Sequence, residues 1–240
     1  MVGKSQLKRI RSLQQKKYRN ELGLFFVEGK KTVQELLDAK VIPFEIYATH
    51  LEDFVLKDDK FFEITPQELK QISQLKNPNG VLGVFHMPKF NTIVEDDWVL
   101  VLDDVRDPGN LGTIIRLCDW FGIKNVVCSN QTVDCYNPKV LQATMGSIAR
   151  IAIHYRDIEN YLKNTSLPIF GAFMNGSTVY ESELQNAGIL VMGNEGQGIS
   201  QEIEKCIQEK ISIPQFGNQT TESLNVATAT AILLNEIRRS

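Results

Sequence analysis

Three short motifs constrain this 240-residue chain more than any other feature. They are Asn110–Arg116, Gly193–Ile199 and the segment from Ile213 to Val226. Each joins an apolar run to a polar or glycine-rich turn that leads into a predicted helix. Runs such as Trp98–Leu102 and Gly188–Met192 are typical of strands buried on both faces of a sheet. Because open α/β sheets bind ligands at strand ends, the motifs predict one ligand site there.

The first motif predicts a helix that begins near Asn110. Asp103–Gly109 interrupts the preceding apolar run, and an asparagine at a helix start accepts hydrogen bonds from the first N–H groups. From Leu111 onward, apolar residues recur at helical spacing. Arg116 therefore falls on the polar side of this helix.

The second and third motifs differ from a phosphate-binding loop. The second has the order Gly-x-x-Gly-x-Gly with Glu195 inside it, whereas dinucleotide-binding loops have Gly-x-Gly-x-x-Gly. An acidic side chain here favours a ligand that donates hydrogen bonds. The third motif has a short strand at Lys210–Pro214, a polar loop, and a helix beginning near Ser223 or Asn225. Serine and asparagine are both favoured N-cap residues.

Alternating strands and helices predict an α/β architecture along the whole chain. In the first half, strands are expected at residues 24–27, 44–48, 61–64 and 81–85. Helices are expected near 30–39 and 65–76, and a polar linker at 87–97. Beyond the linker, further strands are expected at 124–128, 148–154 and 168–173. The pattern thus indicates a small α/β domain followed by a larger one.

Together the three motifs resemble those of the SpoU or TrmH family, RNA ribose 2'-O-methyltransferases of the SPOUT superfamily. The resemblance extends from Trp98 to about Arg239. Phe25–Gly29 and Asn79–Val84 are similar to the ends of an L30e-like substrate-binding domain. The resemblance implies an L30e-like α/β domain at residues 1–90 and a SPOUT catalytic α/β domain at 91–240. The catalytic domain would end in a deep trefoil knot.

The same resemblance implies a cofactor and a set of site residues. S-adenosylmethionine would bind in the knot, at positions that correspond to Gly193, Ile213 and Leu224. The positions that correspond to catalytic residues are Arg116, Asn110, Glu195, Ser223 and Asn225. Family members are homodimers with the active site at the subunit interface, and the apolar helix predicted at 226–237 suits such an interface.

The predicted reaction assigns a role to Arg116. A ribose 2'-hydroxyl is a weak nucleophile, so methyl transfer needs alignment and stabilisation of the charge that develops as the proton leaves. A guanidinium stays protonated in proteins, so Arg116 is unsuited to be a general base. We interpret it as the group that holds the adjacent phosphate and stabilises the developing alkoxide, with the proton relayed through phosphate or water.

These polar residues also have purely structural interpretations. Arg116 could pair with Asp103, Asp104 or Asp107, and Asn110 could do no more than cap its helix. Glu195 could serve only to favour the N-terminus of the helix that follows it. The loop at 215–222 is longer than the family's common form, so its contacts with the cofactor cannot be placed from sequence.

The distribution of charge predicts RNA binding better than the net charge of −3 does. The first twenty residues contain many lysines and arginines and no acid, with Leu7, Ile10 and Leu13 as a thin apolar seam. A basic helix of this kind can lie along phosphates, although it could also be only a solvated face. We expect RNA contacts from Lys8, Arg9, Lys16 and Lys17.

Composition limits the other classes of protein. With 42% hydrophobic and 23% charged residues the chain is of ordinary globular composition. No apolar stretch is long enough to span a membrane and no signal-peptide pattern is present, so we expect a cytoplasmic protein. The four cysteines lack Cys-x-x-Cys spacing and the three histidines are far apart. We therefore expect reduced thiols and no metal site.

We predict S-adenosylmethionine-dependent 2'-O-methylation of structured RNA. The L30e-like domain favours ribosomal RNA over transfer RNA. Three alternatives share the fold: a tRNA 2'-O-methyltransferase, a base-directed SPOUT methyltransferase and a non-catalytic RNA-binding protein. A base-directed enzyme usually lacks the Asn-x-Gly-x-x-x-Arg motif, and a non-catalytic protein has little need for Asn110, Arg116, Glu195 and Asn225 together.

Overall fold

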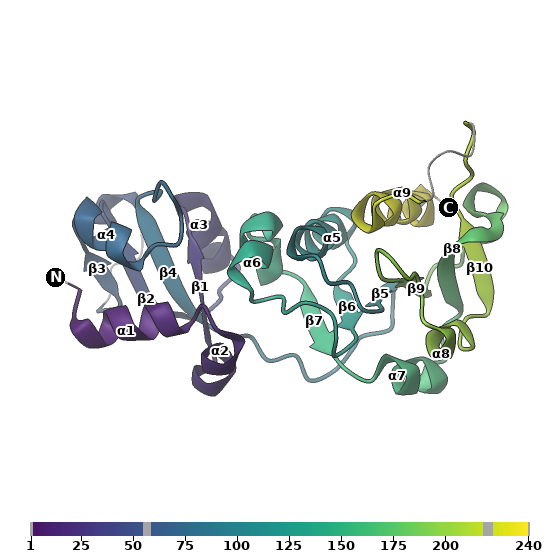
Figure 1. Ribbon diagram of the computed structural model, residues 1–240, viewed down its shortest axis with the longest axis horizontal. Coiled ribbons are helices and arrows are strands. Elements are labelled where there is room, and N and C mark those ends of the chain that lie inside the picture. The colour runs from purple at the N-terminus through teal and green to yellow at the C-terminus, as the bar shows by residue number, and fades with distance from the viewer. Residues whose placement is uncertain (1, 55–58, 218–222, 240) are drawn as a thin grey trace. The chain divides into compact units, whose positions relative to one another are not determined.

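The computed structural model describes residues 2–54, 59–217 and 223–239, and the chain divides into two compact units (Figure 1). The first unit is formed by residues 1–89 with 134–149, and the second by 90–133 with 150–240. The segment 134–149 therefore belongs to the first unit, although the residues before and after it in the chain belong to the second.

The first unit contains a four-stranded sheet in the order β1-β4-β2-β3. Strand β4 is antiparallel to both neighbours, and β2 and β3 are parallel. The four strands predicted here are confirmed within one or two residues. The elements are α1 (Lys4–Ser12), α2 (Lys16–Leu22), β1 (Leu24–Glu28), α3 (Lys30–Asp38), β2 (Pro43–Ala48), η1 (Leu51–Asp53), β3 (Phe61–Glu63), α4 (Pro66–Ile72), β4 (Val81–His86), α6 (Pro138–Thr144) and η2 (Ser147–Ala149).

Helices α1 and α4 pack on one face of this sheet. Ile10 of α1 and Leu13 directly after it are almost fully buried, in one cluster with Leu24 and Phe26 of β1. Leu7 packs against the same cluster. The apolar seam predicted from Leu7, Ile10 and Leu13 is therefore confirmed, and it anchors the basic N-terminal segment to the sheet.

The segment 134–149 completes the first unit around β1. The Phe25 and Tyr136 ring centroids are 4.8 Å apart. Arg19 is 2% exposed, and its guanidinium pairs with Asp134 and donates to the Leu13 carbonyl at 2.8 Å. Breaking a buried pair of this kind is strongly destabilising, because it leaves one charge without a partner. Arg19 is thus a structural residue, although it lies among the basic residues of the N-terminus.

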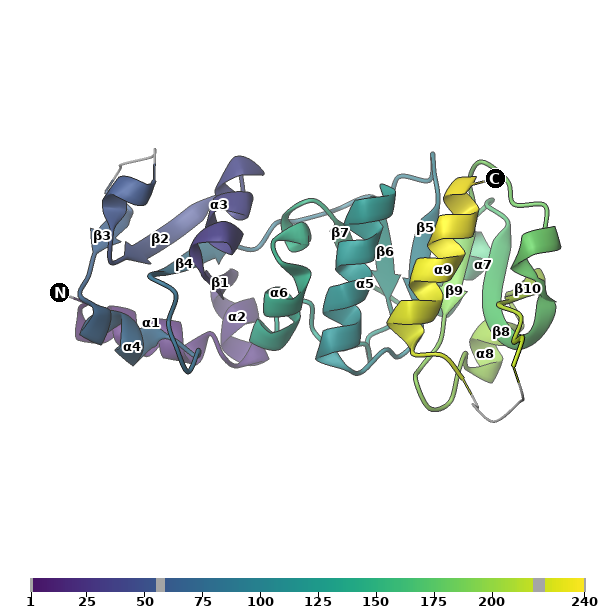
Figure 2. The same ribbon diagram turned by 90° about the horizontal axis from the view of Figure 1, so that it is seen from above.

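The second unit contains a six-stranded parallel sheet in the order β10-β8-β9-β5-β6-β7. Helices α5 and α9 lie side by side on one face, and α7 and α8 cover the other (Figures 1 and 2). The elements are β5 (Val99–Leu102), α5 (Pro108–Phe121), β6 (Asn125–Cys128), β7 (Ala152–Tyr155), α7 (Ile158–Asn164), β8 (Ile169–Thr178), η3 (Val179–Glu181), β9 (Ile189–Met192), α8 (Gln201–Glu204), β10 (Glu209–Ser212) and α9 (Val226–Arg239).

The central strands of this sheet are buried on both faces, as their apolar runs predict. All four residues of β5 and of β9 are buried. Val99 and Val101 join a cluster with Ile158 of α7 and Ile203 of α8. Because side chains alternate along a strand, Leu100 points to the opposite face, where α5 and α9 lie. The predicted α/β class is confirmed, and the sheet of this unit is parallel.

Two strands differ from the prediction. The strand expected at 148–154 begins only at Ala152, because Met145 (φ 52°) and Gly146 (φ 97°) are left-handed and Ser147–Ala149 forms a 3-10 turn. The strand expected to end at Phe173 continues to Thr178. Its pairing with β10 jumps from Gly171 to Ser177, so the residues between them leave the ladder.

Candidate active site

Helix α5 begins three residues earlier than the sequence indicates. The Asp107 carboxylate accepts a hydrogen bond from the Asn110 N–H at 2.8 Å and is the N-cap, and Pro108 occupies the first helical position. The expectation that Asn110 caps this helix is therefore wrong. Aspartate followed by proline is a strong helix-start signal, and the sequence contains it. Because Asp107 is the cap, the Asn110 side chain is left for other contacts.

The glycine-rich loop after β9 closes on itself. Asn194 and Gly198 exchange backbone hydrogen bonds of 2.9 Å, and Asn194 Oδ1 accepts from the N–H of Gly196 at 2.9 Å. Gly198 has φ 71°, and a Cβ on Gly193 would lie 2.2 Å from the Gly198 carbonyl carbon. Glycine is thus required at both positions for the loop to close.

A chain of hydrogen bonds joins the three motifs. Asn225 Oδ1 accepts from the N–H groups of Ala227 and Thr228 at the start of α9, as an N-cap does. Its Nδ2 donates to Asn110 Oδ1 at 2.9 Å, and Asn110 Nδ2 donates to Glu195 Oε1 at 3.0 Å. A carboxylate can only accept, so Glu195 requires Asn110 to present its Nδ2. At the other end of the network, the N–H groups that start α9 require Asn225 to present its Oδ1, and these two amide orientations are compatible with the Asn225–Asn110 hydrogen bond. Hydrogen bonds thereby join the segments that follow β5, β9 and β10.

The Glu195 carboxylate lies at the N-terminus of α5. It accepts from the backbone N–H of Asp107 at 3.3 Å and of Arg106 at 3.4 Å. A negative charge is favoured at this end of a helix. From the sequence, Glu195 was expected to stabilise the N-terminus of the helix that follows it. In the structure Glu195 lies instead at the N-terminus of α5, which precedes it in the chain.

A cavity of about 550 Å³ opens beside this network. The predicted cofactor residues Gly193, Ile213 and Leu224 line it, together with Glu195 and Ser223. Residues 218–222 of the long loop lie outside the described residues. The cavity also has walls that the sequence did not indicate, because their apolar residues are indistinguishable from core. These walls are formed by Ala172, Phe173 and Met174 of β8 and by Val226, Ala229 and Leu233 of α9.

Arg116 is exposed on α5 and is not part of the hydrogen-bonded chain. Among the described residues it has no ion-pair partner, and the proposed structural partners have other contacts. Asp104 holds Arg106, Asp107 caps α5, and Asp103 accepts from the N–H of Ser200 at 2.8 Å. Among the described residues, the Arg116 guanidinium is therefore available for a substrate phosphate or oxyanion.

The four predicted RNA-contacting residues, all in the first unit, fall into two groups. Lys8, Lys16 and Lys17 are exposed. The Arg9 guanidinium is instead held by Glu45, with an Nη2–Oε1 distance of 2.6 Å, and lies 4.7 Å from the Phe44 ring centroid. Arg9 is thus partly committed to the fold of its own unit.

The cavity fits an amphiphilic ligand such as S-adenosylmethionine. Its volume is within the range of small-molecule sites. Its lining includes apolar side chains such as Leu233, Ile211 and Met192, which suit an adenine ring, and the glycine loop with Glu195 supplies backbone groups and a carboxylate for polar ligand atoms. Among the described residues no group of three or more His, Cys, Asp or Glu side chains could hold a metal ion, and no helix could cross a membrane.

Comparison with known proteins gives full-length matches. The SpoU rRNA methylase family profile matches residues 97–235, and an MRM3-like substrate binding domain profile matches 4–83. The Bacillus subtilis 23S rRNA (guanosine(2553)-2'-O)-methyltransferase RlmP is 32% identical, over 95% of this chain and 94% of that protein.

Solved structures agree. A structure from Porphyromonas gingivalis assigned to the TrmH family is 38% identical with a TM-score of 0.92, over 100% of this chain and 99% of that one. An AdoMet-bound rRNA methyltransferase from Sinorhizobium meliloti is 30% identical with a TM-score of 0.88, over 100% and 97%. The chain belongs to the SpoU rRNA methylase family.

Proposed function

We propose that this protein transfers a methyl group from S-adenosylmethionine to a ribose 2'-hydroxyl of ribosomal RNA. The observation that carries the proposal is the Glu195–Asn110–Asn225 chain, which brings the three motifs together at the edge of the cavity. The names of the relatives support ribosomal RNA as substrate, because the Bacillus subtilis protein is named as a 23S rRNA 2'-O-methyltransferase.

The residues divide the work of the reaction. Gly193, Ile213 and Leu224 hold the cofactor, which supplies an electrophilic methyl group when bound. The coupled side chains of Asn110, Glu195 and Asn225, with Ser223 at the cavity wall, orient the ribose. Arg116 stabilises negative charge on the 2'-oxygen as the proton leaves for phosphate or water. The hydrogen bonds among Asn110, Glu195 and Asn225 hold these side chains in place before the reaction, so they align the ribose without reorganisation.

The finer architecture is part of the same proposal. Residues 91–240 form a SPOUT domain whose last segment is a trefoil knot, and residues 1–90 form an L30e-like RNA-binding domain. In support of the knot, the cavity is built from the loops after β9 and β10 and from the start of α9. In support of the second domain, the match to the substrate binding profile covers 4–83. The segment 134–149 packs with this domain.

Methylation of unmodified ribosomal RNA by the purified protein tests the function. With a radiolabelled methyl donor we expect incorporation at one nucleotide, followed by 2'-O-methyl mapping to find its position. Incorporation into transfer RNA alone would favour the tRNA alternative. Cofactor binding without methyl transfer to either RNA would favour a non-catalytic protein.

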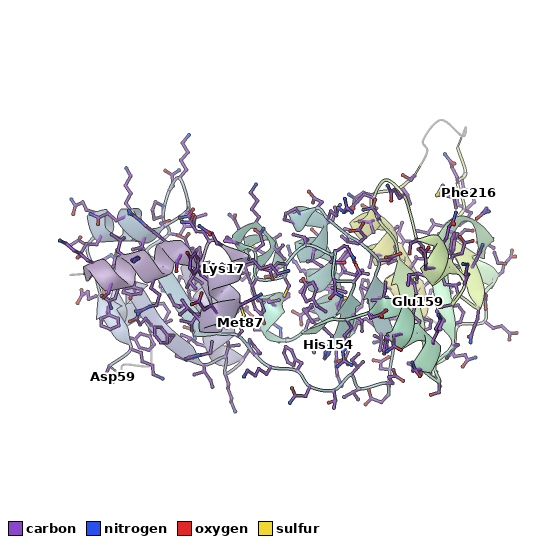
Figure 3. All side chains as sticks on the ribbon, turned by 60° about the horizontal axis from the view of Figure 1, so that its bottom comes forward. Lys17, Asp59, Met87, His154, Glu159 and Phe216 are labelled. Carbon is purple, nitrogen blue, oxygen red and sulfur yellow. The ribbon has the colours of Figure 1, made fainter. Side chains whose placement is uncertain are left out.

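The exposed lysines of the first unit supply general affinity for RNA. Lys8 lies on α1, and Lys16 and Lys17 lie on α2. Figure 3 labels Lys17. When all three lysines are replaced by glutamine in one variant, RNA binding should weaken. The slope of log affinity against log salt should fall by about 0.7 to 0.9 for each lost phosphate contact. Arg9 is left in place because it pairs with Glu45.

Filter binding across a salt series measures this change. Cofactor affinity should stay the same, and Lys205→Gln, an exposed lysine of the second unit, serves as a control. A triple variant with the salt slope of the native protein would reduce the basic segment to a solubilising face.

The active form is a homodimer. The apolar residues of α9, which favoured a dimer in the sequence, are largely buried inside the second unit, as Leu233 and Leu234 at 1% exposure show. The support comes instead from α5, where Trp120 is 84% exposed and lies one helical turn beyond Arg116. An indole this exposed favours burial against another surface.

Trp120→Glu should therefore yield a monomer with little methyltransferase activity and a folded cofactor cavity. Sedimentation velocity measures the oligomeric state, and calorimetry measures cofactor affinity. Tyr180→Ala removes another exposed aromatic side chain of the second unit and should leave the dimer intact. A native protein that sediments as a fully active monomer under assay conditions would refute the dimer.

A further inference from the structure

Arg106 lies in the loop between β5 and α5, exposed but fixed in orientation. Its Nε donates to Asp104 Oδ1 at 2.8 Å, and its Nη2 donates to Oδ2 at 2.7 Å. The Arg106 side chain is 69% exposed and that of Asp104 is 22% exposed. An exposed arginine ordinarily samples many rotamers, and a two-point contact with a carboxylate restricts it to one. Within the described residues no other side chain accepts from the guanidinium, so Nη1 and one Nη2 hydrogen remain available.

Asp104 is held in a conformation that non-glycine residues rarely adopt. Its φ is 61°, in the left-handed region. Two contacts maintain this backbone: the Asp104 N–H donates to Ser129 Oγ at 3.0 Å, and its carbonyl accepts from Asn194 Nδ2 at 2.7 Å. Asn194 belongs to the glycine loop that lines the cavity. The strand ends thus support a strained residue whose carboxylate orients one cation.

The surroundings of Arg106 are acidic. Asp103 and Asp107 lie in the same loop as the Arg106–Asp104 pair, and Glu195 of the glycine loop accepts from the Arg106 N–H at 3.4 Å. An RNA backbone that approaches the Glu195 network meets these carboxylates and is repelled. A fixed, exposed guanidinium at this point offsets that repulsion.

We propose that Arg106 binds a phosphate group of the RNA close to the target ribose, with Asp104 as the positioning residue that orients the guanidinium. The inference rests on the proposed function, because it takes RNA as the substrate. The open Nη edge presents parallel donors that match two phosphate oxygens, which an ammonium cannot do. Arg116 is then free to act on the charge at the 2'-oxygen, so the two arginines affect different steps.

The test compares four forms of the full-length protein: native, Arg106→Gln, Arg106→Lys and Arg150→Gln. Arg150 is a matched control, because it also makes a two-point contact with an aspartate, Asp119, in the same unit. Binding to ribosomal RNA transcribed in vitro is measured across a salt series. Cofactor affinity, thermal stability, KM for RNA and kcat are measured on the same proteins.

We expect Arg106→Gln to weaken RNA binding and raise KM about 10- to 100-fold, the effect of losing a charge-assisted contact. Its salt slope should fall by about 0.7 to 0.9, the contribution of one phosphate. Cofactor affinity, melting temperature and kcat should change little. Arg106→Lys should keep the native salt slope but bind more weakly, because it keeps the charge and loses the planar edge. Arg150→Gln should match the native protein in RNA binding.

Two results would overturn the inference. One is an Arg106→Gln variant with native RNA affinity and salt slope. The other is an Arg106→Gln variant whose cofactor affinity or melting temperature falls together with its RNA affinity. Arg106 would then serve only to hold its own loop in place. A native protein that binds ribosomal RNA without methylating it would instead refute the proposed function, and the binding data would still decide the role of Arg106.

Discussion

Replacing Arg116 with alanine should reduce methyl transfer by about 10² to 10³-fold or more, because the cation proposed to stabilise the developing charge is lost. Cofactor affinity should remain close to native, since Arg116 is not among the residues that line the cavity. Arg116 is exposed, so its loss should leave folding intact. Single-turnover kinetics at saturating RNA measure the chemical step, and calorimetry measures cofactor binding.

Two further variants sharpen this experiment. Arg116→Lys keeps a positive charge without the planar fork, so it should recover part of the rate if charge alone matters. Arg150→Ala, an exposed arginine outside the hydrogen-bonded network, should have native kinetics. If Arg116→Ala turns over within about threefold of the native protein, Arg116 has no part in the mechanism.

The three positions that the family resemblance assigns to the cofactor lie together in the structure. Gly193, Ile213 and Leu224 all line the cavity. Gly193 has a signal that does not depend on distant parts of the fold, since a side chain there would collide with Gly198. Ile213 and Leu224 stand on either side of a polar loop after a proline-ended strand. All three follow strand ends, where an open α/β sheet binds a ligand, but their role in holding the cofactor comes from the family resemblance and stays a prediction.

The sequence failed where partners are distant along the chain. Asn110 was expected to cap a helix, but its partners Glu195 and Asn225 come from two other motifs, and only the folded sheet brings them together. Arg9 and Arg19 resemble free surface cations in sequence, yet one pairs with Glu45 and the other with Asp134. Charge in a window of residues does not reveal a carboxylate supplied by a remote segment.

Two structural features had no usable sequence signal. The residues between Gly171 and Ser177 leave the β8–β10 ladder, and the first three of them, Ala172, Phe173 and Met174, supply part of the cavity wall while continuing the apolar run of the strand. The segment 134–149 lies between two strands of the second unit but packs with the first. Its apolar residues indicate burial without indicating in which core.

Replacing the target ribonucleotide with its 2'-deoxy form should abolish methyl transfer while RNA binding persists. The 2'-hydroxyl is the proposed nucleophile, so its removal leaves no acceptor for the methyl group. Affinity rests mainly on phosphate and shape contacts, including those proposed for the exposed lysines and Arg106, and these do not involve the missing oxygen. Filter binding and methyl incorporation on one chimeric RNA measure both quantities.

The control is the same RNA with a deoxy substitution at a neighbouring position, which should be methylated at a rate close to that of the unsubstituted RNA. A base-directed enzyme would often tolerate the change at the target, because its acceptor is a ring nitrogen. Methylation of the deoxy target at the native rate would therefore reassign the reaction to the nucleobase. It would also leave Asn110, Glu195 and Asn225 joined at the cavity for a purpose other than holding a ribose hydroxyl.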